Sequence, residues 1–246
     1  MGETRVALID ELNESVKSLE GYNYITRDSY LQREACDNLT ALLRRLGDLK
    51  QEAIDRGDDD MANTLLGFEC SVGFLRASIS MWLLLKEGRA DDAWRRLVEA
   101  QRLVADAVRA HPGFARMAGH GKQLQAIEDL IFPPQKFMSL GMVVRKRLCS
   151  ICGEVYGECD HLVGRPYMGH LCHTIVSEIE EMNHIAFVDQ PADKNARVVE
   201  FNVPGGRKNR MTWKVTPGEV AAPDPADGQK GLAVNAILSG DGLLGH

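Results

Sequence analysis

Apolar residues recur every three or four positions through the first half of the chain, a spacing that places them on one face of an α-helix. Five such stripes occupy residues 9–19, 39–53, 65–82, 91–108 and 124–131. Long helices with short connections pack best as an antiparallel bundle. The pattern therefore predicts a helical bundle over residues 1–132.

Residues at the ends of these stripes are typical helix boundaries. Asp28-Ser29 and Asp58 offer side-chain oxygens that can cap the first amides of a helix, and Gly57 and Gly88 suit helix ends. The stripe after Asp91 is broken by Pro112 and Gly113.

The hydrophobic period changes after Pro133-Pro134. Residues 133–141 read as a linker, and residues 142–216 as a small module with a short antiparallel sheet. Strands are predicted at 142–148, 184–188, 196–201 and 211–215, with a helix from 173 to about 182. Residues 217–246, rich in Ala, Pro, Gly and Asp, are predicted to be a loosely ordered tail. The fold class is therefore α+β.

Four of the six cysteines lie between Cys149 and Cys172, in the pattern C-x2-C-x6-C-x-H-x10-C. Cys149 and Cys152 have the spacing with which a tight turn presents two thiolates to one metal, and Gly153 supplies a permissive backbone. Cys159 and His161 lie two residues apart, so in an extended segment both side chains point the same way. The cluster predicts one tetrahedral Zn²⁺ site.

Five candidate ligands compete for four positions. Cys149, Cys152 and Cys172 are the first choices, and either Cys159 or His161 is the fourth. Disulfides are the alternative, but the N-terminal residues are charged and amphipathic and do not resemble a signal peptide. We therefore expect a cytoplasmic protein, in which C-x2-C more often binds metal than forms a disulfide.

A knuckle on a hairpin, a long loop and a ligand at a helix N-terminus make up a treble-clef layout. The run also resembles a Cys/His zinc-binding segment of uncharacterised bacterial and phage-related proteins, which has the same C-x-I-C-G start, C-x-H and closing Y-x-G-x-x-C. This resemblance covers about a quarter of the chain, and it implies zinc binding rather than an activity.

Asp160-His161 and Cys172-His173 give a second, weaker resemblance, to HNH-type endonucleases. That resemblance implies that His161 activates water and that Asp160 or His173 helps to hold a divalent ion. The sequence departs from the HNH pattern because the second C-x2-C is missing and Cys159 stands where no ligand is expected.

A third resemblance lies after the fourth predicted helix. Arg116 and His120 resemble the arginine–histidine pair of HEPN nucleases, but their gap of three residues is shorter than in that motif. We assign no function to this pair from the sequence.

The net charge of −6 argues against a generally basic nucleic-acid binder. The zinc-containing part is nevertheless the only stretch that is not acidic. Its two basic clusters make nucleic-acid contact a possible accessory function. These clusters are Arg145, Lys146, Arg147 and Arg207, Lys208, Arg210. The longest apolar run, near residues 79–85, is too short for a membrane helix, so no membrane partner is expected.

The sequence therefore favours a zinc-binding structural or interaction protein rather than an enzyme. In this interpretation the zinc module stabilises the C-terminal half, and the helical bundle contacts a protein partner. The alternative is a degenerate HNH-type metal-dependent endonuclease with His161 as its general base.

Overall fold

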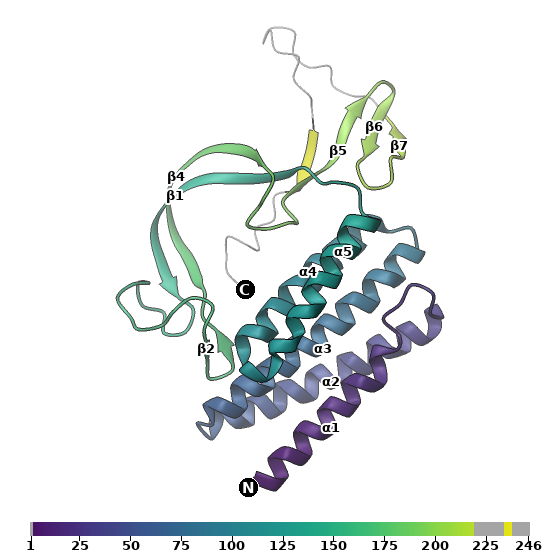
Figure 1. The fold of residues 1–246 in the computed structure, drawn as a ribbon. Coiled ribbons are helices and arrows are strands. Elements are labelled where there is room, and N and C mark those ends of the chain that lie inside the picture. Colours follow the sequence, from purple (N-terminus) through teal and green to yellow (C-terminus); the bar gives the residue numbers. More distant parts are fainter. Residues whose placement is uncertain (1, 219–233, 238–246) are drawn as a thin grey trace. The chain divides into compact units, whose positions relative to one another are not determined.

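The computed structural model describes residues 2–218 and 234–237, and it confirms the α+β class (Figure 1). The helices are α1 (Gly2–Glu20), α2 (Ser29–Asp55), α3 (Asp59–Lys86), α4 (Ala90–Ala110), the 3-10 helix η1 (Pro112–Met117) and α5 (Ala118–Ile131). The strands are β1 (Phe137–Cys149), β2 (Pro166–Tyr167), β3 (His170–Leu171), β4 (Thr174–Val188), β5 (Arg197–Val203), β6 (Gly206–Asn209), β7 (Val215–Pro217) and β8 (Val234–Ile237).

The chain divides into two compact units. The first contains the chain up to Glu128 together with residues 160–173, and the second contains residues 129–159 and the chain from Thr174 onward. The sequence predicted domains that are each one continuous stretch of chain. In the structure the first unit is discontinuous, because the hairpin β2–β3 belongs with the helices.

Helix α3 is the centre of the helical unit, where it packs against α2 and α4 (Figure 1). Its buried residues occupy every face, and Met61 to Leu65 are buried consecutively, as expected for a helix surrounded by others. By length and composition α3 is the one helix in the described ranges that is apolar enough to cross a membrane. Its apolar window is 72% buried inside the protein, which is the environment of a core helix.

The predicted helix boundaries agree with the capping contacts. Asp28 accepts hydrogen bonds from the amides of Tyr30 and Leu31, and Asp58 accepts one from Met61. Gly57 and Gly88 follow α2 and α3 with positive φ angles of 68° and 74°, a conformation that glycine adopts without strain.

The hairpin β2–β3 is held onto α3 by two backbone amides. Met168 N donates to Asp59 Oδ1 at 2.6 Å, and Gly169 N donates to Asn63 Oδ1 at 2.8 Å. Gly169 has a φ of 75°, and a Cβ there would lie 3.3 Å from the carbonyl oxygen of Ala62. This position therefore favours glycine on two grounds.

The second unit is built on a long antiparallel pair, β1 and β4, in a sheet of order β4-β1-β5-β6-β7 with β8 beside β5. Strand β1 begins at Phe137, inside the predicted linker 133–141, and ends at Cys149. Strands are also present in the predicted regions 184–188 and 196–201, as parts of β4 and β5. The strand predicted at 211–215 is largely wrong, because 211–212 form a turn and β7 begins at Val215.

The helix predicted from residue 173 to about 182 is wrong. Strand β4 occupies this region, pairing with β1 from Cys149–Thr174 to Phe137–Val188. Its β-branched residues Thr174, Ile175, Val176 and Ile179 suit a strand. Without that helix, the treble-clef layout lacks its closing element. Most of the predicted tail, 217–246, lies outside the described residues; within it, β8 pairs with β5.

Candidate metal centre

Four side chains from the predicted cluster converge. The Sγ atoms of Cys149, Cys152 and Cys159 and a ring nitrogen of His161 all lie within 4.8 Å of one another. In a tetrahedral site with metal–sulfur bonds of about 2.3 Å, neighbouring sulfurs are about 3.8 Å apart. The observed spacing is therefore compatible with one shared metal ion.

The Cys149 knuckle is formed by backbone hydrogen bonds at the end of β1. Gly153 N donates to Cys149 O, and Cys149 N donates to Glu154 O, each at 2.8 Å. Gly153 has a φ of 76°, which permits this tight turn. The Ile151 amide donates to Cys149 Sγ at 3.4 Å, which stabilises negative charge on a sulfur that is fully buried.

The Cys152 thiol is the exposed member of the group. A hydrogen bond from the Glu154 backbone lowers its pKa, but desolvation and the neighbouring Cys149 and Cys159 thiols outweigh that effect and raise the pKa overall. Three adjacent thiols resist losing their protons together, because the thiolates would repel one another. A bound cation removes that repulsion.

His161 supplies the nitrogen of the cluster. Its Nδ1 is buried and has no hydrogen-bond partner among the described residues, which is the condition of a nitrogen that faces a metal. The ring packs edge-on against Tyr167, with centroids 4.7 Å apart. Tyr167 is itself fixed, since its hydroxyl accepts a hydrogen bond from the Leu162 amide at 2.9 Å.

Cys172, one of the three first-choice ligands, is not part of this group. It is buried in the segment after Gly164, where its amide donates to Arg165 O and its carbonyl accepts from Gly164 N. Cys159 and His161, which competed for the fourth position in the sequence, both lie in the cluster. None of the six cysteines forms a disulfide.

The other residues of the HNH resemblance are also outside the cluster. Asp160 is exposed, and His173 Nδ1 lies 3.3 Å from the carbonyl oxygen of Leu171, to which it can donate. The closing helix expected after Cys172-His173 is strand β4.

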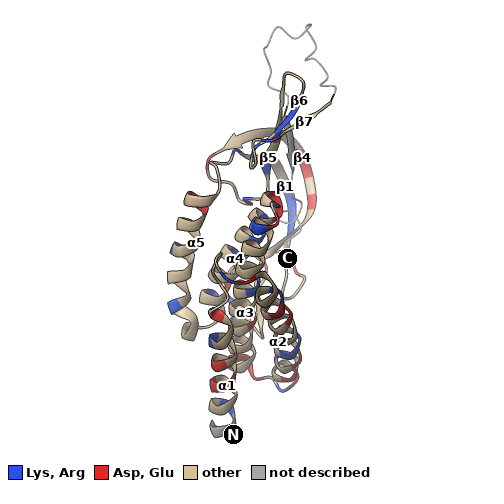
Figure 2. Cartoon of the chain, turned by 90° about the vertical axis from the view of Figure 1, so that its right-hand side faces the viewer, with Lys and Arg blue, Asp and Glu red and all other residues tan. Residues whose placement is uncertain are grey.

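The basic cluster on β1 lies beside an acidic neighbour (Figure 2). Arg145 Nε is 3.9 Å from Glu178 Oε2, and Lys146 is the cross-strand partner of Glu178 in β4. In the second cluster Lys208 lies over the Trp213 ring at 4.3 Å, and Arg210 donates to Pro134 O at 2.7 Å. These contacts partly occupy the cations for which the sequence suggested nucleic-acid contact as a possible accessory function.

One group of polar residues was given no function in the sequence analysis. His111, Arg116 and His120 line a common cavity in the helical unit. Their signal in the sequence was weak, because it consisted of three basic or imidazole residues within a short segment after a helix.

Comparisons with protein-family models, with curated proteins and with solved structures find no match for this chain. The functional argument therefore rests on the geometry of the sites themselves.

Proposed function

We propose that the chain is a zinc-binding structural and interaction protein, in which one Zn²⁺ ion is held by Cys149, Cys152, Cys159 and His161. The observation that carries this proposal is the convergence of three sulfurs and one imidazole nitrogen within 4.8 Å. Zinc is preferred because thiolate and imidazole ligands in a tetrahedral set are typical of Zn²⁺ sites in proteins.

A structural role is favoured over a catalytic one because all four positions are filled by protein ligands. Catalytic zinc sites keep one position open for water or substrate, and this ligand set leaves none. His161 as a ligand is also unable to serve as a general base, since the metal occupies the lone pair that would accept the proton.

The loop between the first and last ligands needs such support. Residues 150–160 contain no helix or extended strand, and none of them is buried. Its apolar contacts supply little free energy to offset the cost of ordering the chain. Metal binding supplies that free energy in small domains whose apolar core is insufficient.

Metal analysis of paired variants tests the ligand set. The wild type should carry about one zinc per chain. Cys159→Ser and His161→Ala should lose most of it, whereas Cys172→Ser and His173→Ala should retain it. Far-UV circular dichroism of each variant checks that it is folded. Zinc retained by Cys159→Ser but lost by a folded Cys172→Ser would refute the proposed ligands.

Partner contact is the second part of the proposal. The helical bundle was its predicted site, and β4 now offers a further candidate surface. This edge strand exposes several large apolar side chains: Ile179, Met182, Ile185 and Phe187. Exposed apolar side chains on an unpaired strand edge favour association with another chain. Sedimentation velocity of the wild type and of Ile185→Thr/Phe187→Thr tests whether this surface associates with a second copy of the chain.

Nucleic-acid contact through Arg145–Arg147 and Arg207–Arg210 is proposed as an accessory function. Such binding should weaken steeply with salt, because it releases counterions from the phosphates. Filter binding of duplex DNA at two salt concentrations, with Arg207→Gln/Lys208→Gln as the variant, measures it. Plasmid nicking with added Mg²⁺ or Mn²⁺ in the same samples tests the nuclease alternative.

A further inference from the structure

The helical unit contains a cavity of about 390 Å³ that is separate from the cysteine cluster. Residues of α1, α3, η1 and α5 line it. Small-molecule sites in proteins are typically about 300–1,000 Å³. Because one water takes up about 30 Å³ of liquid, a cavity of this size accommodates a ligand on the order of a dozen non-hydrogen atoms.

Aromatic rings form the apolar wall of the cavity. Phe68 and Phe114 are in edge-to-face contact, with centroids 5.1 Å apart and planes at 89°. The Phe114 ring is able to approach α3 closely because residue 67 is a glycine, whose missing Cβ would lie 2.2 Å from Phe114 Cε2. Ile9 and Val16 of α1 extend the apolar lining. This wall suits the flat, apolar body of an aromatic ligand.

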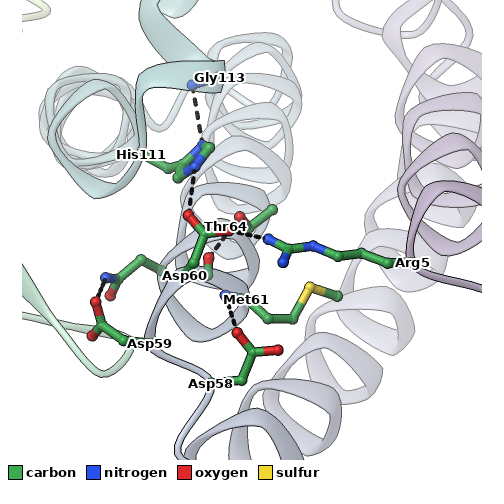
Figure 3. Close-up of polar contacts among 9 residues, drawn as sticks. Arg5, Asp58, Asp59, Asp60, Met61, Thr64, His111 and Gly113 are labelled. Carbon is green, nitrogen blue, oxygen red and sulfur yellow. Dashed lines mark hydrogen bonds and ion pairs between the residues drawn. The ribbon is translucent and has the colours of Figure 1, made fainter. Parts of the chain in front are cut away.

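Two polar residues of the lining, Arg5 and His111, are joined through Asp60 in one hydrogen-bonded network (Figure 3). Asp60 accepts a hydrogen bond from Arg5, which holds the pKa of Asp60 below its ordinary value. His111 Nδ1 accepts a hydrogen bond from Gly113 N at 3.1 Å, so the ring proton of neutral His111 is on Nε2, which lies 3.3 Å from Asp60 Oδ1. The charges of Arg5 and Asp60 offset each other, and both His111 nitrogens have partners.

Arg116 is the cation at this cavity that the network does not use. It is exposed, and its side chain makes no hydrogen bond or ion pair with any residue that the structure describes. His120, four residues later in the sequence, also lines the cavity and is oriented by two contacts. Its Nδ1 lies 3.1 Å from Gln123 Oε1, and its ring is 5.0 Å from that of Phe74. Because an amide oxygen only accepts, Nδ1 is the donor in this pair.

We propose that this cavity binds a small organic anion with an aromatic body, such as an aryl carboxylate. The ring of the ligand packs against Phe68 and Phe114, and its carboxylate pairs with Arg116. Arginine is suited to this role because its planar fork of N–H groups matches a carboxylate with two parallel hydrogen bonds. Glu20 is the carboxylate that also lines the cavity, and it opposes an anion there.

Isothermal titration of the full chain with 2-naphthoate, and with the neutral 2-naphthamide, tests the proposal. Naphthoate should bind with one site per chain and at least about tenfold more tightly than the amide. Arg116→Gln should abolish this preference, whereas Glu20→Gln should increase it. Both residues are exposed, so neither substitution threatens folding. Arg56→Gln, at an exposed arginine that follows α2 and lies outside the cavity, is the matched control and should bind like the wild type.

The outcomes are exclusive. Absence of naphthoate binding to the wild type overturns the proposal. So does naphthoate binding by Arg116→Gln at wild-type strength, because the anion would then be held elsewhere. The proposal is supported if the preference for naphthoate over naphthamide is lost in Arg116→Gln and increased in Glu20→Gln. None of these readouts depends on the metal content of the cysteine cluster.

Discussion

Gly67→Ala should destabilise the helical unit even though alanine is the better helix former. In the middle of a helix this exchange ordinarily stabilises by roughly 0.5–1 kcal/mol. Here the new Cβ would lie 2.2, 2.4 and 2.8 Å from three ring carbons of Phe114. A comfortable carbon–carbon contact is about 3.5–4.0 Å, so the ring must move by more than about 1 Å.

That movement has a calculable cost. Overpacking a well-filled site costs about 1–3 kcal/mol, and the displaced ring also loses its edge-to-face contact with Phe68, worth about 0.5–1.5 kcal/mol. After subtracting the gain in helix propensity, we expect Gly67→Ala to lower the free energy of unfolding by about 0.5–4 kcal/mol, with the midpoint of these terms near about 2 kcal/mol. Gly121→Ala in α5 is the control, because its Cβ would meet Val104 at an ordinary 3.7 Å.

Urea denaturation followed by far-UV circular dichroism measures both variants, since the helices dominate that signal. A double-mutant cycle identifies the cause: in a Phe114→Ala background the clash is absent, and Gly67→Ala should stabilise by about 0.5–1 kcal/mol. The reasoning is refuted if Gly67→Ala stabilises the otherwise wild-type chain as much as Gly121→Ala does. It is equally refuted if removing Phe114 leaves the effect of Gly67→Ala unchanged.

Three further measurements test other features. Burial raises the pKa of Cys70 from 9.0 to about 12, so above pH 9 the unfolded chain loses the thiol proton before the folded chain does. The free energy of unfolding should therefore fall between pH 9 and pH 12, with a slope of up to about 1.4 kcal/mol per pH unit. Urea denaturation of Cys70→Ala should show a shallower decline over that window, and full stability should be present below pH 9. Asp58→Ala should cost about 1 kcal/mol, because the Met61 amide loses its cap, whereas exposed Asp48→Ala in mid-helix should not destabilise; thermal melts compare the two. Chelation of bound metal should make three additional thiols react with Ellman's reagent in the wild type but almost none in Cys152→Ser, because that variant lacks one of the four ligands and should already have lost its metal.

The helices were predictable from the sequence because their signals are local. The apolar period of α2 and α4, the capping oxygens of Asp28 and Asp58 and the glycines after α2 and α3 all act within a few residues of one another. The knuckle at Cys149 was predictable for the same reason, since a C-x2-C turn followed by Gly153 involves only neighbouring residues.

The first part of strand β4 was predicted as a helix because its identity as a strand depends on a distant segment. Ile175, Val176, Ile179 and Met182 satisfy a helical spacing, but each also has a cross-strand partner in β1. The spacing of these apolar residues is compatible with a helix or with a strand. Hydrogen bonding to β1, which pairs residues as far apart as Phe137 and Val188, decides for the strand. The cavity was unpredictable in the same way, because its wall joins residues of α1 to residues after α4.

Which cysteines join the cluster follows from the backbone contacts of residues 149–161 and of Cys172. The four donors lie within thirteen consecutive residues, from Cys149 at the end of β1 to His161, and residues 150–160 contain no helix or extended strand, so the donors can approach one another at a small entropic cost. Cys172 is held differently. The Met168 and Gly169 amides just before it donate to side chains of α3, and its own backbone is paired with Gly164 and Arg165. A cysteine fixed by this many backbone contacts has its position set by the helical unit rather than by a metal, which explains why the compact C-x2-C-x6-C-x-H run forms the cluster without it.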